Sequence, residues 1–178
     1  RQMCIRDRYR PITKEEVRAE LAAKTTAGYG AQVRAYFVKT PFQPAFELRD
    51  AQRLAGELSM PLTVIEFDVL SVPGAAANGP ERCYHCKRAG FTAIVNHAKS
   101  LGFPTVIDGS NAGDRGDYRP GMRAAEELGV RSPLMEVGFT KDEERELLRA
   151  WGYPVWNLPA GACLACLLYT SPSPRDTE

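Results

Sequence analysis

Apolar residues recur at two spacings along this chain, and the two spacings alternate. Runs with period two, or rich in β-branched residues, predict strands at residues 32–38, 62–67 and 104–107, with a fourth short strand at 134–137. Apolar residues three and four apart predict helices at residues 46–57, 87–101 and 122–128. Capping boxes that begin at Thr13 and Thr140 predict two more helices, which run to about residues 27 and 151.

Strands that alternate with helices are typical of βαβ units. The pattern therefore predicts an α/β fold, in which helices flank a largely parallel, Rossmann-like sheet. In such sheets ligands bind at the carboxyl ends of the strands. Three predicted loops follow strands, at residues 39–44, 69–86 and 108–121. We expect these loops to lie near one another and to hold the functional site.

The two ends of the chain have an unusual relation at the level of codons. Codons can be chosen for residues 1–8 and 166–178 such that the core of the first stretch is the reverse complement of the start of the second. Paired ends of this kind resemble translated sequencing adapters of a metagenomic fragment. We therefore expect one partial domain at residues 9–165, flanked by non-native segments, and we exclude those segments from fold reasoning.

Composition excludes some classes of function. The chain has 178 residues, 25% of them charged, and a net charge of +1, which argues against a nucleic-acid-binding surface. No apolar run approaches the roughly 20 residues of a membrane helix, so we expect no membrane partner. The sequence shows no charged-then-apolar leader at its start, and we expect a cytoplasmic protein.

The loop at residues 108–121 is rich in glycine, aspartate and arginine. Its glycines, at positions 109, 113, 116 and 121, would let the backbone turn tightly and approach a ligand. Arg119 offers a planar fork for phosphate or carboxylate, and Asp114 and Asp117 could hold Mg²⁺ or orient Arg119. A polar turn closed by its own side-chain hydrogen bonds remains an equal alternative.

Cysteines provide the second candidate site. Cys4 and Cys166 fall in the excluded ends, which leaves Cys83, Cys86 and Cys163. The odd number argues against a disulfide framework. The Cys83-x-x-Cys86 spacing suits a metal site or thiol chemistry, and three cysteines that meet in space could hold a [4Fe–4S] cluster. Three unconnected thiols remain the alternative. His85 could serve as a fourth ligand, although a polar loop role suits it better, and His97 lies on a predicted helix as a structural residue.

Several stretches in order resemble the LarE family of ATP-dependent sulfur transferases. They cover roughly residues 28–165 and comprise residues 82–87 (RCYHCK), 108–111 (DGSN), 117–121 (DYRPG), 123–125 (RAA), 128–134 (LGVRSPL), 138–141 (GFTK) and 159–165 (PAGACLA). The resemblance implies a PP-loop ATP pyrophosphatase fold, with ATP and Mg²⁺ as cofactors. It implies that the parent protein adenylates a carboxylate of a pyridinium mononucleotide and converts it to a thiocarboxylate, in nickel-pincer nucleotide cofactor biosynthesis.

The same resemblance implies roles for individual residues. Cys163 matches the sulfur-donor position, and Cys83, Cys86 and Cys163 match a version that uses a [4Fe–4S] cluster. The expected cofactor-binding residues are Gly109, Ser110, Asn111, Asp117 and Arg119. The expected partners are a small-molecule nucleotide substrate and, in the full-length parent, further copies of the same chain.

Some features depart from the family pattern. The Ser-Gly-Gly-x-Asp-Ser pyrophosphate loop is absent from the sequence, residues 9–27 match poorly, and the expected Ser-Arg does not follow Ala165. We therefore expect the fragment to be inactive on its own. Two alternatives stay open. One is another PP-loop enzyme, such as a tRNA thiolase or an amide-forming ligase, and the other is a non-enzymatic metal-binding module built on Cys83 and Cys86.

Overall fold

A computed structural model describes residues 33–116, 119–158 and 163. The helix predicted to begin at Thr13 and the two expected adapter segments lie outside these residues. The described residues form two compact units. One comprises residues 33–94, 120–124 and 163, and the other comprises residues 95–116, 119 and 125–158.

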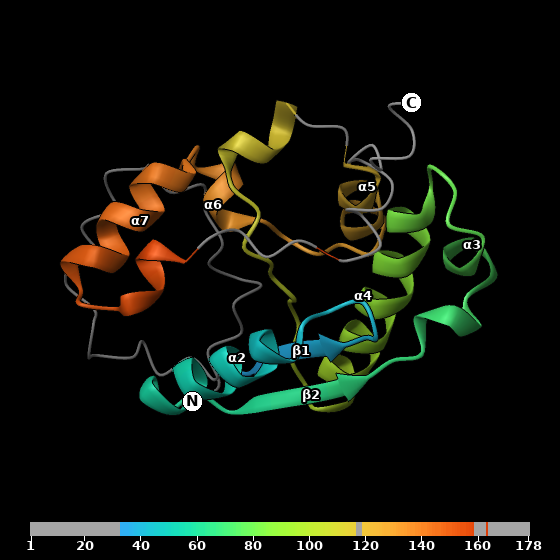
Figure 1. Ribbon diagram of the computed structural model, residues 1–178, viewed down its shortest axis with the longest axis horizontal. Coiled ribbons are helices and arrows are strands. Elements are labelled where there is room, and N and C mark those ends of the chain that lie inside the picture. The colour runs from blue at the N-terminus through green and yellow to red at the C-terminus, as the bar shows by residue number, and fades with distance from the viewer. Residues whose placement is uncertain (1–32, 117–118, 159–162, 164–178) are drawn as a thin grey trace, which may run out of the picture. The chain divides into compact units, whose positions relative to one another are not determined.

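The first unit begins with a βαβ motif. Strand β1 (Ala35–Lys39) is followed by helix α2 (Ala45–Glu57) and strand β2 (Leu62–Glu66), and the two strands pair in parallel (Figure 1). The register sets Phe37 opposite Val64. An ion pair of 2.9 Å between Lys39 and Glu66 joins the carboxyl ends of the strands. The parallel sheet and its crossover helix confirm the predicted α/β class for this part of the chain.

Three helices follow β2. They are the 3₁₀ helix η2 (Val69–Ser71), the short helix α3 (Pro73–Ala76) and the long helix α4 (Arg82–Ser100). The Asp68 side chain caps η2 by accepting a hydrogen bond from the Leu70 amide at 3.0 Å. Helix α4 packs against β1 where Gly90 faces Val38. It therefore carries its first turns to the carboxyl end of the sheet, beside the loop that follows β1.

The second unit is built from the end of α4 and further helices. They are η3 (Ala112–Gly116), the larger part of α5 (Pro120–Glu127), α6 (Pro133–Glu136), α7 (Lys141–Ala150) and η4 (Pro154–Asn157). Thr140 and Glu143 form the predicted capping box at the start of α7. Glycines with positive φ follow four of these helices, at positions 102, 129, 138 and 152. Glycine is favoured there because it adopts the left-handed conformation without strain.

Each unit has a small apolar core. In the first unit the buried apolar residues are Ala55, Val69, Ala75, Ile94 and Ala124. In the second they are Val95, Ala98, Ala125, Val130 and Phe139. Val69 and Phe139 are completely buried, so each anchors its unit. Among the described residues, no helix is long and apolar enough to cross a membrane.

Two of the predicted strands are wrong. Residues 104–107 form a single parallel bridge between Ile107 and Arg131, in which Arg131 donates to the Val106 carbonyl at 3.0 Å. The short run 134–137 lies in and just after helix α6, because Pro133 has the φ angle of a first helical turn. Short apolar runs do not distinguish strand from helix by spacing alone.

The segment before residue 87 also differs from its prediction. Residues 69–86 were expected as a loop, whereas α4 already begins at Arg82 and contains both Cys83 and Cys86. Cysteine and tyrosine are weak helix formers, so the sequence pattern around them favoured a loop. As a consequence, the two cysteines stand on a helix of 19 residues rather than on an irregular segment.

Candidate functional site

Three cysteine side chains line one pocket in the first unit. The pocket has a volume of about 270 Å³. It is lined by Val38, Thr40, Phe42, Gln43, Arg82, Cys83, Cys86, Lys87, Gly90, Phe91, Ile94 and Cys163. We call it the sulfur pocket. It lies where β1 ends and α4 begins, so the first two of the three predicted loops do meet at the carboxyl end of the sheet.

Helix geometry places two of the sulfurs in the pocket. Cys83 and Cys86 are three residues apart in α4, and residues at that spacing share one face of a helix. Cys163 joins them from a position 80 residues after Cys83 along the chain, and all three side chains are half-buried thiols. The structure therefore brings together the three cysteines that the sequence singled out.

Arg82 connects two of these sulfurs. Its Nη2 atom donates to the Cys83 sulfur at 3.2 Å, and its Nη1 atom donates to the Cys163 sulfur at 3.8 Å. Since the two nitrogens belong to one planar guanidinium, the two sulfurs lie within about 9 Å of each other. The guanidinium carbon also stands 5.7 Å from the centre of the Phe42 ring.

The thiol of Cys86 has a perturbed environment. Burial raises the pKa of the Cys86 thiol because it disfavours the charged thiolate. The positive charge of Arg82 opposes this rise in pKa, the thiols of Cys163 and Cys83 add to it, and Lys87 opposes it weakly. No Asp or Glu side chain lines the sulfur pocket among the described residues, so its charged lining residues are Arg82 and Lys87.

The arrangement bears on the expected metal site. Three thiols are the donor set of a cluster that leaves one iron open. In the part of the chain that the structure describes, however, no group of three His, Cys, Asp or Glu side chains converges closely enough to hold a metal ion. The Arg82 guanidinium lies against two of the sulfurs instead. Metal binding by Cys83, Cys86 and Cys163 stays a prediction.

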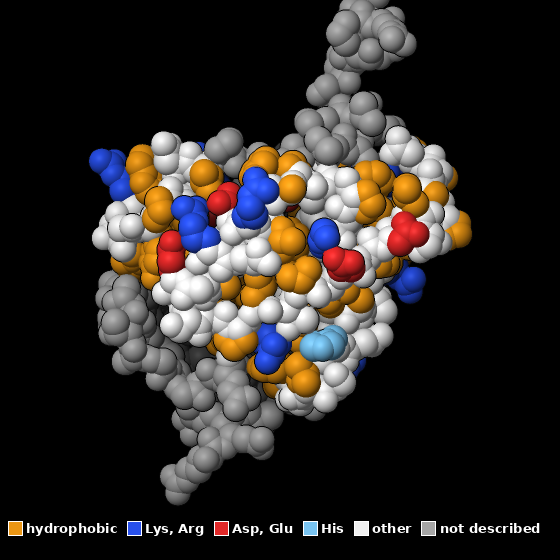
Figure 2. Space-filling view, turned by 60° about the horizontal axis from the view of Figure 1, so that its bottom comes forward, with side chains coloured by type: hydrophobic (Ala, Val, Ile, Leu, Met, Phe, Trp, Pro, Cys, Tyr) orange, Lys and Arg blue, Asp and Glu red, His pale blue; other side chains and the backbone are white. Residues whose placement is uncertain are grey.

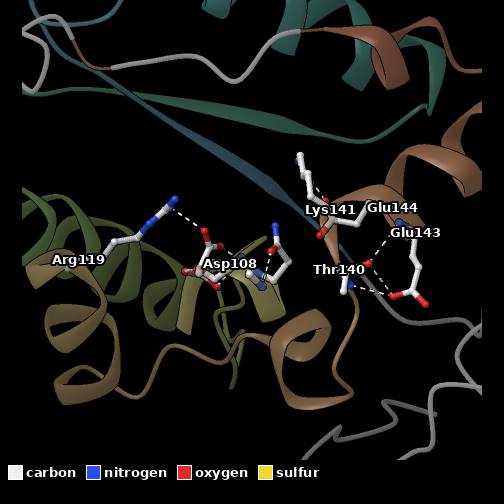
Figure 3. Close-up of polar contacts among 10 residues, drawn as sticks. Asp108, Arg119, Thr140, Lys141, Glu143 and Glu144 are labelled. Carbon is white, nitrogen blue, oxygen red and sulfur yellow. Dashed lines mark hydrogen bonds and ion pairs between the residues drawn. The ribbon is translucent and has the colours of Figure 1, made fainter. Parts of the chain in front are cut away.

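The second candidate site, the loop that begins at Asp108, lies in the second unit. Asp108 accepts hydrogen bonds from Ser110, through its amide at 3.2 Å and its hydroxyl at 2.9 Å, and from the Ser132 hydroxyl at 2.6 Å (Figure 3). Asn111 is buried, and its side-chain oxygen accepts from the Gly113 amide at 3.0 Å. These contacts are the internal turn bonds of the alternative reading, so Ser110 and Asn111 have structural roles whether or not they also contact a nucleotide.

Of the two roles considered for Asp114, the structure shows the one in which Asp114 orients Arg119. Its Nη1 atom lies 2.7 Å from an Asp114 oxygen, so Asp114 orients Arg119 (Figure 3). Asp117 lies outside the described residues. Gly113 lies in the 3₁₀ helix η3, and neither Gly109 nor Gly113 has a positive φ, so the chain turns there with ordinary φ angles. Gly121 is buried in the first unit, where any side chain would collide with the aliphatic stem of Lys87.

Sequence reasoning assigned no role to two pocket residues that lie close to the sulfurs or to their arginine partner. Arg82 is 4% exposed and touches two of the three sulfurs, and Phe42 lies beside its guanidinium. An arginine directly before a Cys-x-x-Cys pair is a signal that could have pointed to Arg82. Phe42 gives no such signal, because its place depends on how the loop after β1 meets α4.

A second cluster lies on the same stretch of α4. Arg123 forms an ion pair with Glu81 and stacks over the Tyr84 ring at 4.1 Å, and Tyr84 in turn contacts His85 edge to face. His85 packs against Gly74 of α3, which has no room for a side chain. His85 is thus a packing residue, and His97 lies exposed near the end of α4. On the face shown in Figure 2, acidic and basic side chains are scattered among apolar ones.

No protein-family model matches the chain. The chain is 40% identical over 119 residues to an uncharacterized protein of Synechocystis sp., an alignment that covers 67% of this chain and 44% of that protein. It is 32% identical over 113 residues to an uncharacterized protein of Methanocaldococcus jannaschii, covering 64% and 43%. The chain spans less than half the length of these curated relatives. It is also similar to the pyridinium-3,5-bisthiocarboxylic acid mononucleotide synthase of Lactiplantibacillus plantarum, with 33% identity over 119 residues, which are 67% of this chain and 43% of that enzyme.

Proposed function

We propose that this chain is part of an ATP-dependent sulfur transferase of the LarE type, which converts a carboxylate of a pyridinium mononucleotide to a thiocarboxylate. The observation that carries the proposal is the meeting of Cys83, Cys86 and Cys163 in one pocket. Its support from comparison is the 33% identity to a synthase whose name describes a bisthiocarboxylic acid product. The proposal includes the PP-loop fold, a cytoplasmic location and a homo-oligomeric full-length protein.

The chemistry needs an activated acyl group and a sulfur nucleophile. ATP supplies the activation, since adenylation of the carboxylate releases pyrophosphate and leaves AMP as a good leaving group. The Cys163 thiolate attacks the acyl carbon, AMP departs, and a thioester forms. Loss of the Cα proton then breaks the Cβ–S bond, which releases the thiocarboxylate and leaves dehydroalanine at position 163.

A catalytic alternative within the same proposal uses all three thiols. Cys83, Cys86 and Cys163 would hold a [4Fe–4S] cluster, which would relay sulfide from an external source and so leave Cys163 intact. The donor set suits such a cluster, but the side chains are not gathered as metal ligands in this structure, and Arg82 lies on two of them. A cluster would therefore need the Arg82 side chain to withdraw from the sulfurs.

The loop that begins at Asp108 is proposed to contact the nucleotide or the substrate through Arg119, with Gly109, Ser110, Asn111 and Asp117 as neighbours and Mg²⁺ as the companion ion. Arg119 is half-exposed and is oriented by Asp114, so its planar fork is held by one carboxylate while part of it faces solvent. In a longer protein that contains this chain, Arg119→Ala should weaken adenylation. Unchanged ATP-dependent pyrophosphate release would remove Arg119 from the site.

The test of the function uses a longer protein that contains this chain, supplied with Mg-ATP and pyridinium-3,5-dicarboxylic acid mononucleotide. We expect pyrophosphate release and a thiocarboxylate product. After a single turnover, mass spectrometry should show a loss of about 34 Da, the mass of H₂S, at Cys163. Cys163→Ala should abolish the thiocarboxylate and preserve pyrophosphate release, because adenylation precedes sulfur transfer.

The outcomes separate the alternatives. With inorganic sulfide added to the assay, an intact Cys163 after many turnovers, with product formation lost in Cys83→Ala, would favour the cluster version. Metal binding without ATP-dependent pyrophosphate release would instead indicate a metal-binding module. A product that is unaffected by Cys163→Ala would contradict the assigned role of Cys163.

A further inference from the structure

Arg82 occupies an unfavourable position for a residue that only fills space. Its side chain is charged at all ordinary pH values, yet the residue is 4% exposed. Burial of a charge is costly unless strong polar contacts replace the lost water. Arg82 is also the first residue of α4, where the helix dipole disfavours a positive charge. Specific contacts must therefore offset both penalties.

The contacts of Arg82 join three separate segments of the chain. Its two terminal nitrogens donate to the sulfurs of Cys83, on the same helix, and Cys163, 81 residues away. The Phe42 ring, from the loop after β1, lies 5.7 Å from the guanidinium carbon. A planar fork can engage two acceptors at once with a fixed angle between them, which an ammonium group on a flexible stem cannot do.

Cys163 follows a run of small residues. The three residues before it are Ala160, Gly161 and Ala162, whose side chains are absent or a single methyl group. A nucleophile must be held about 3–3.5 Å from the atom that it attacks. These residues add no long side chain on that side of Cys163, whereas the Arg82 guanidinium contacts the Cys163 sulfur directly.

We propose that Arg82 is a positioning residue, which holds the Cys163 sulfur beside Cys83 in the sulfur pocket through the two arms of its guanidinium. The consequence for sulfur donation rests on the proposed function. The geometric part does not, because it concerns the distance between two thiols of this chain.

The geometric part is tested by cross-linking. In the 178-residue chain, Cys4, Cys86 and Cys166 are changed to Ser, so that Cys83 and Cys163 remain. The rate of intramolecular cross-linking by o-phenylenedimaleimide is measured by mass spectrometry. The cross-linking rate is divided by the rate at which a monofunctional maleimide modifies the same thiols. The ratio, called the normalised rate, does not depend on differences in thiol reactivity between variants. Arg82→Ala should lower the normalised rate about tenfold, the ratio that corresponds to about 1.4 kcal/mol.

Two variants and one additive make the result specific. Arg82→Lys should show the same low normalised rate as Arg82→Ala, because one ammonium cannot reach both sulfurs in a fixed geometry. Millimolar guanidinium should partly restore the rate of Arg82→Ala by occupying the vacated space. Arg53→Ala serves as the matched control and should leave the rate unchanged, since Arg53 forms an exposed ion pair with Asp50 on α2.

An unchanged rate in Arg82→Ala, with native circular dichroism, would overturn the proposal. A normalised cross-linking rate of Arg82→Lys equal to that of the unchanged chain would also overturn it. If Arg82→Ala does not fold, Arg82→Gln replaces it, because glutamine keeps a planar polar end without the charge or the second arm. A parent-like rate in a folded Arg82→Gln would also overturn the proposal.

The functional consequence is measured separately, in a longer protein that contains this chain. Arg82→Ala should lower the single-turnover rate constant of thiocarboxylate formation about tenfold and leave the rate of pyrophosphate release unchanged. If the parent protein forms no thiocarboxylate at all, the proposed function fails, and the cross-linking result still decides the role of Arg82. A lower rate of pyrophosphate release equal to the loss of product would show that Arg82 acts before sulfur transfer, which contradicts the proposed role.

Discussion

Truncation of Phe139 tests how the second unit is held together. Phe139 is completely buried, and its backbone joins two segments. Its amide donates to the Leu134 carbonyl at 2.8 Å, and its carbonyl accepts from the Ala112 amide at 2.7 Å. Ala112 directly follows the candidate residues Ser110 and Asn111. The ring therefore anchors the backbone that positions this loop.

Phe139→Ala should destabilise the protein by about 3–5 kcal/mol, because the ring leaves a cavity that the core fills incompletely. For a chain of this length each kcal/mol lowers the melting temperature by about 2–4 °C, so a decrease of roughly 6–20 °C is expected in thermal denaturation followed by circular dichroism. The same substitution at Phe46 is the control. Phe46 is 52% exposed on α2, and surface changes usually stay within about 0.5 kcal/mol.

Hydrogen exchange adds a local measurement. The Ala112 amide should exchange faster in Phe139→Ala than in Phe46→Ala, since its acceptor is the Phe139 carbonyl. Equal melting temperatures for the two variants would refute the assignment of Phe139 as the anchor of this unit. Equal exchange at Ala112, despite a lower melting temperature, would refute the link from the core to the loop.

Three further predictions concern single contacts. Thr140→Ala should cost about 1 kcal/mol in urea denaturation, because it removes the capping box of α7, whereas Thr140→Ser should cost much less. Gly56→Ala should stabilise the chain by about 0.4–1 kcal/mol, since Gly56 lies within α2 with open space around it. Gly74→Ala should destabilise the chain, because the His85 ring occupies the space of the new methyl group. Changes of the same sign in the two melting temperatures would contradict this pair of predictions. The raised pKa of the Cys86 thiol means that the folded state binds its proton more tightly than the unfolded state does, so stability from this group is present below the ordinary thiol pKa of 9.0 and is lost as pH rises through the folded value. Iodoacetamide should accordingly modify Cys86 only at higher pH than it modifies a cysteine peptide, and Cys86→Ser should reduce the loss of stability at alkaline pH.

The sequence predicted the elements whose signals are local. The helix at residues 46–57 and the strand at 62–67 match α2 and β2 to within one residue at each end. The capping box at Thr140 predicted the start of α7 correctly, because the Thr and Glu side chains that make it are only three residues apart. Such signals need no knowledge of the rest of the chain.

The strands predicted at residues 104–107 and 134–137 failed for the opposite reason. A strand exists only if a partner lies beside it, and the described part of the chain offers residues 104–107 a single bridge at Ile107. The spacing of apolar residues within such a short run cannot reveal whether that partner strand is present. The turns at Gly109 and Gly113 do not need the special φ angles of glycine, because side chains of Asp108 and Asn111 close the loop with ordinary φ angles.

The candidate site shows how one misplaced boundary hides a residue. In a loop that spans residues 69–86, Arg82 has no defined direction relative to Cys83 and Cys86. Once α4 begins at Arg82, the first helical turns fix the two cysteines on one face and place the arginine at the buried start of the helix. The third sulfur, Cys163, comes from far along the chain, and it lies within hydrogen-bonding distance of the same guanidinium. The cysteines could be found from their spacing and from family resemblance, whereas the contact of Arg82 with two of their sulfurs is visible only in the fold.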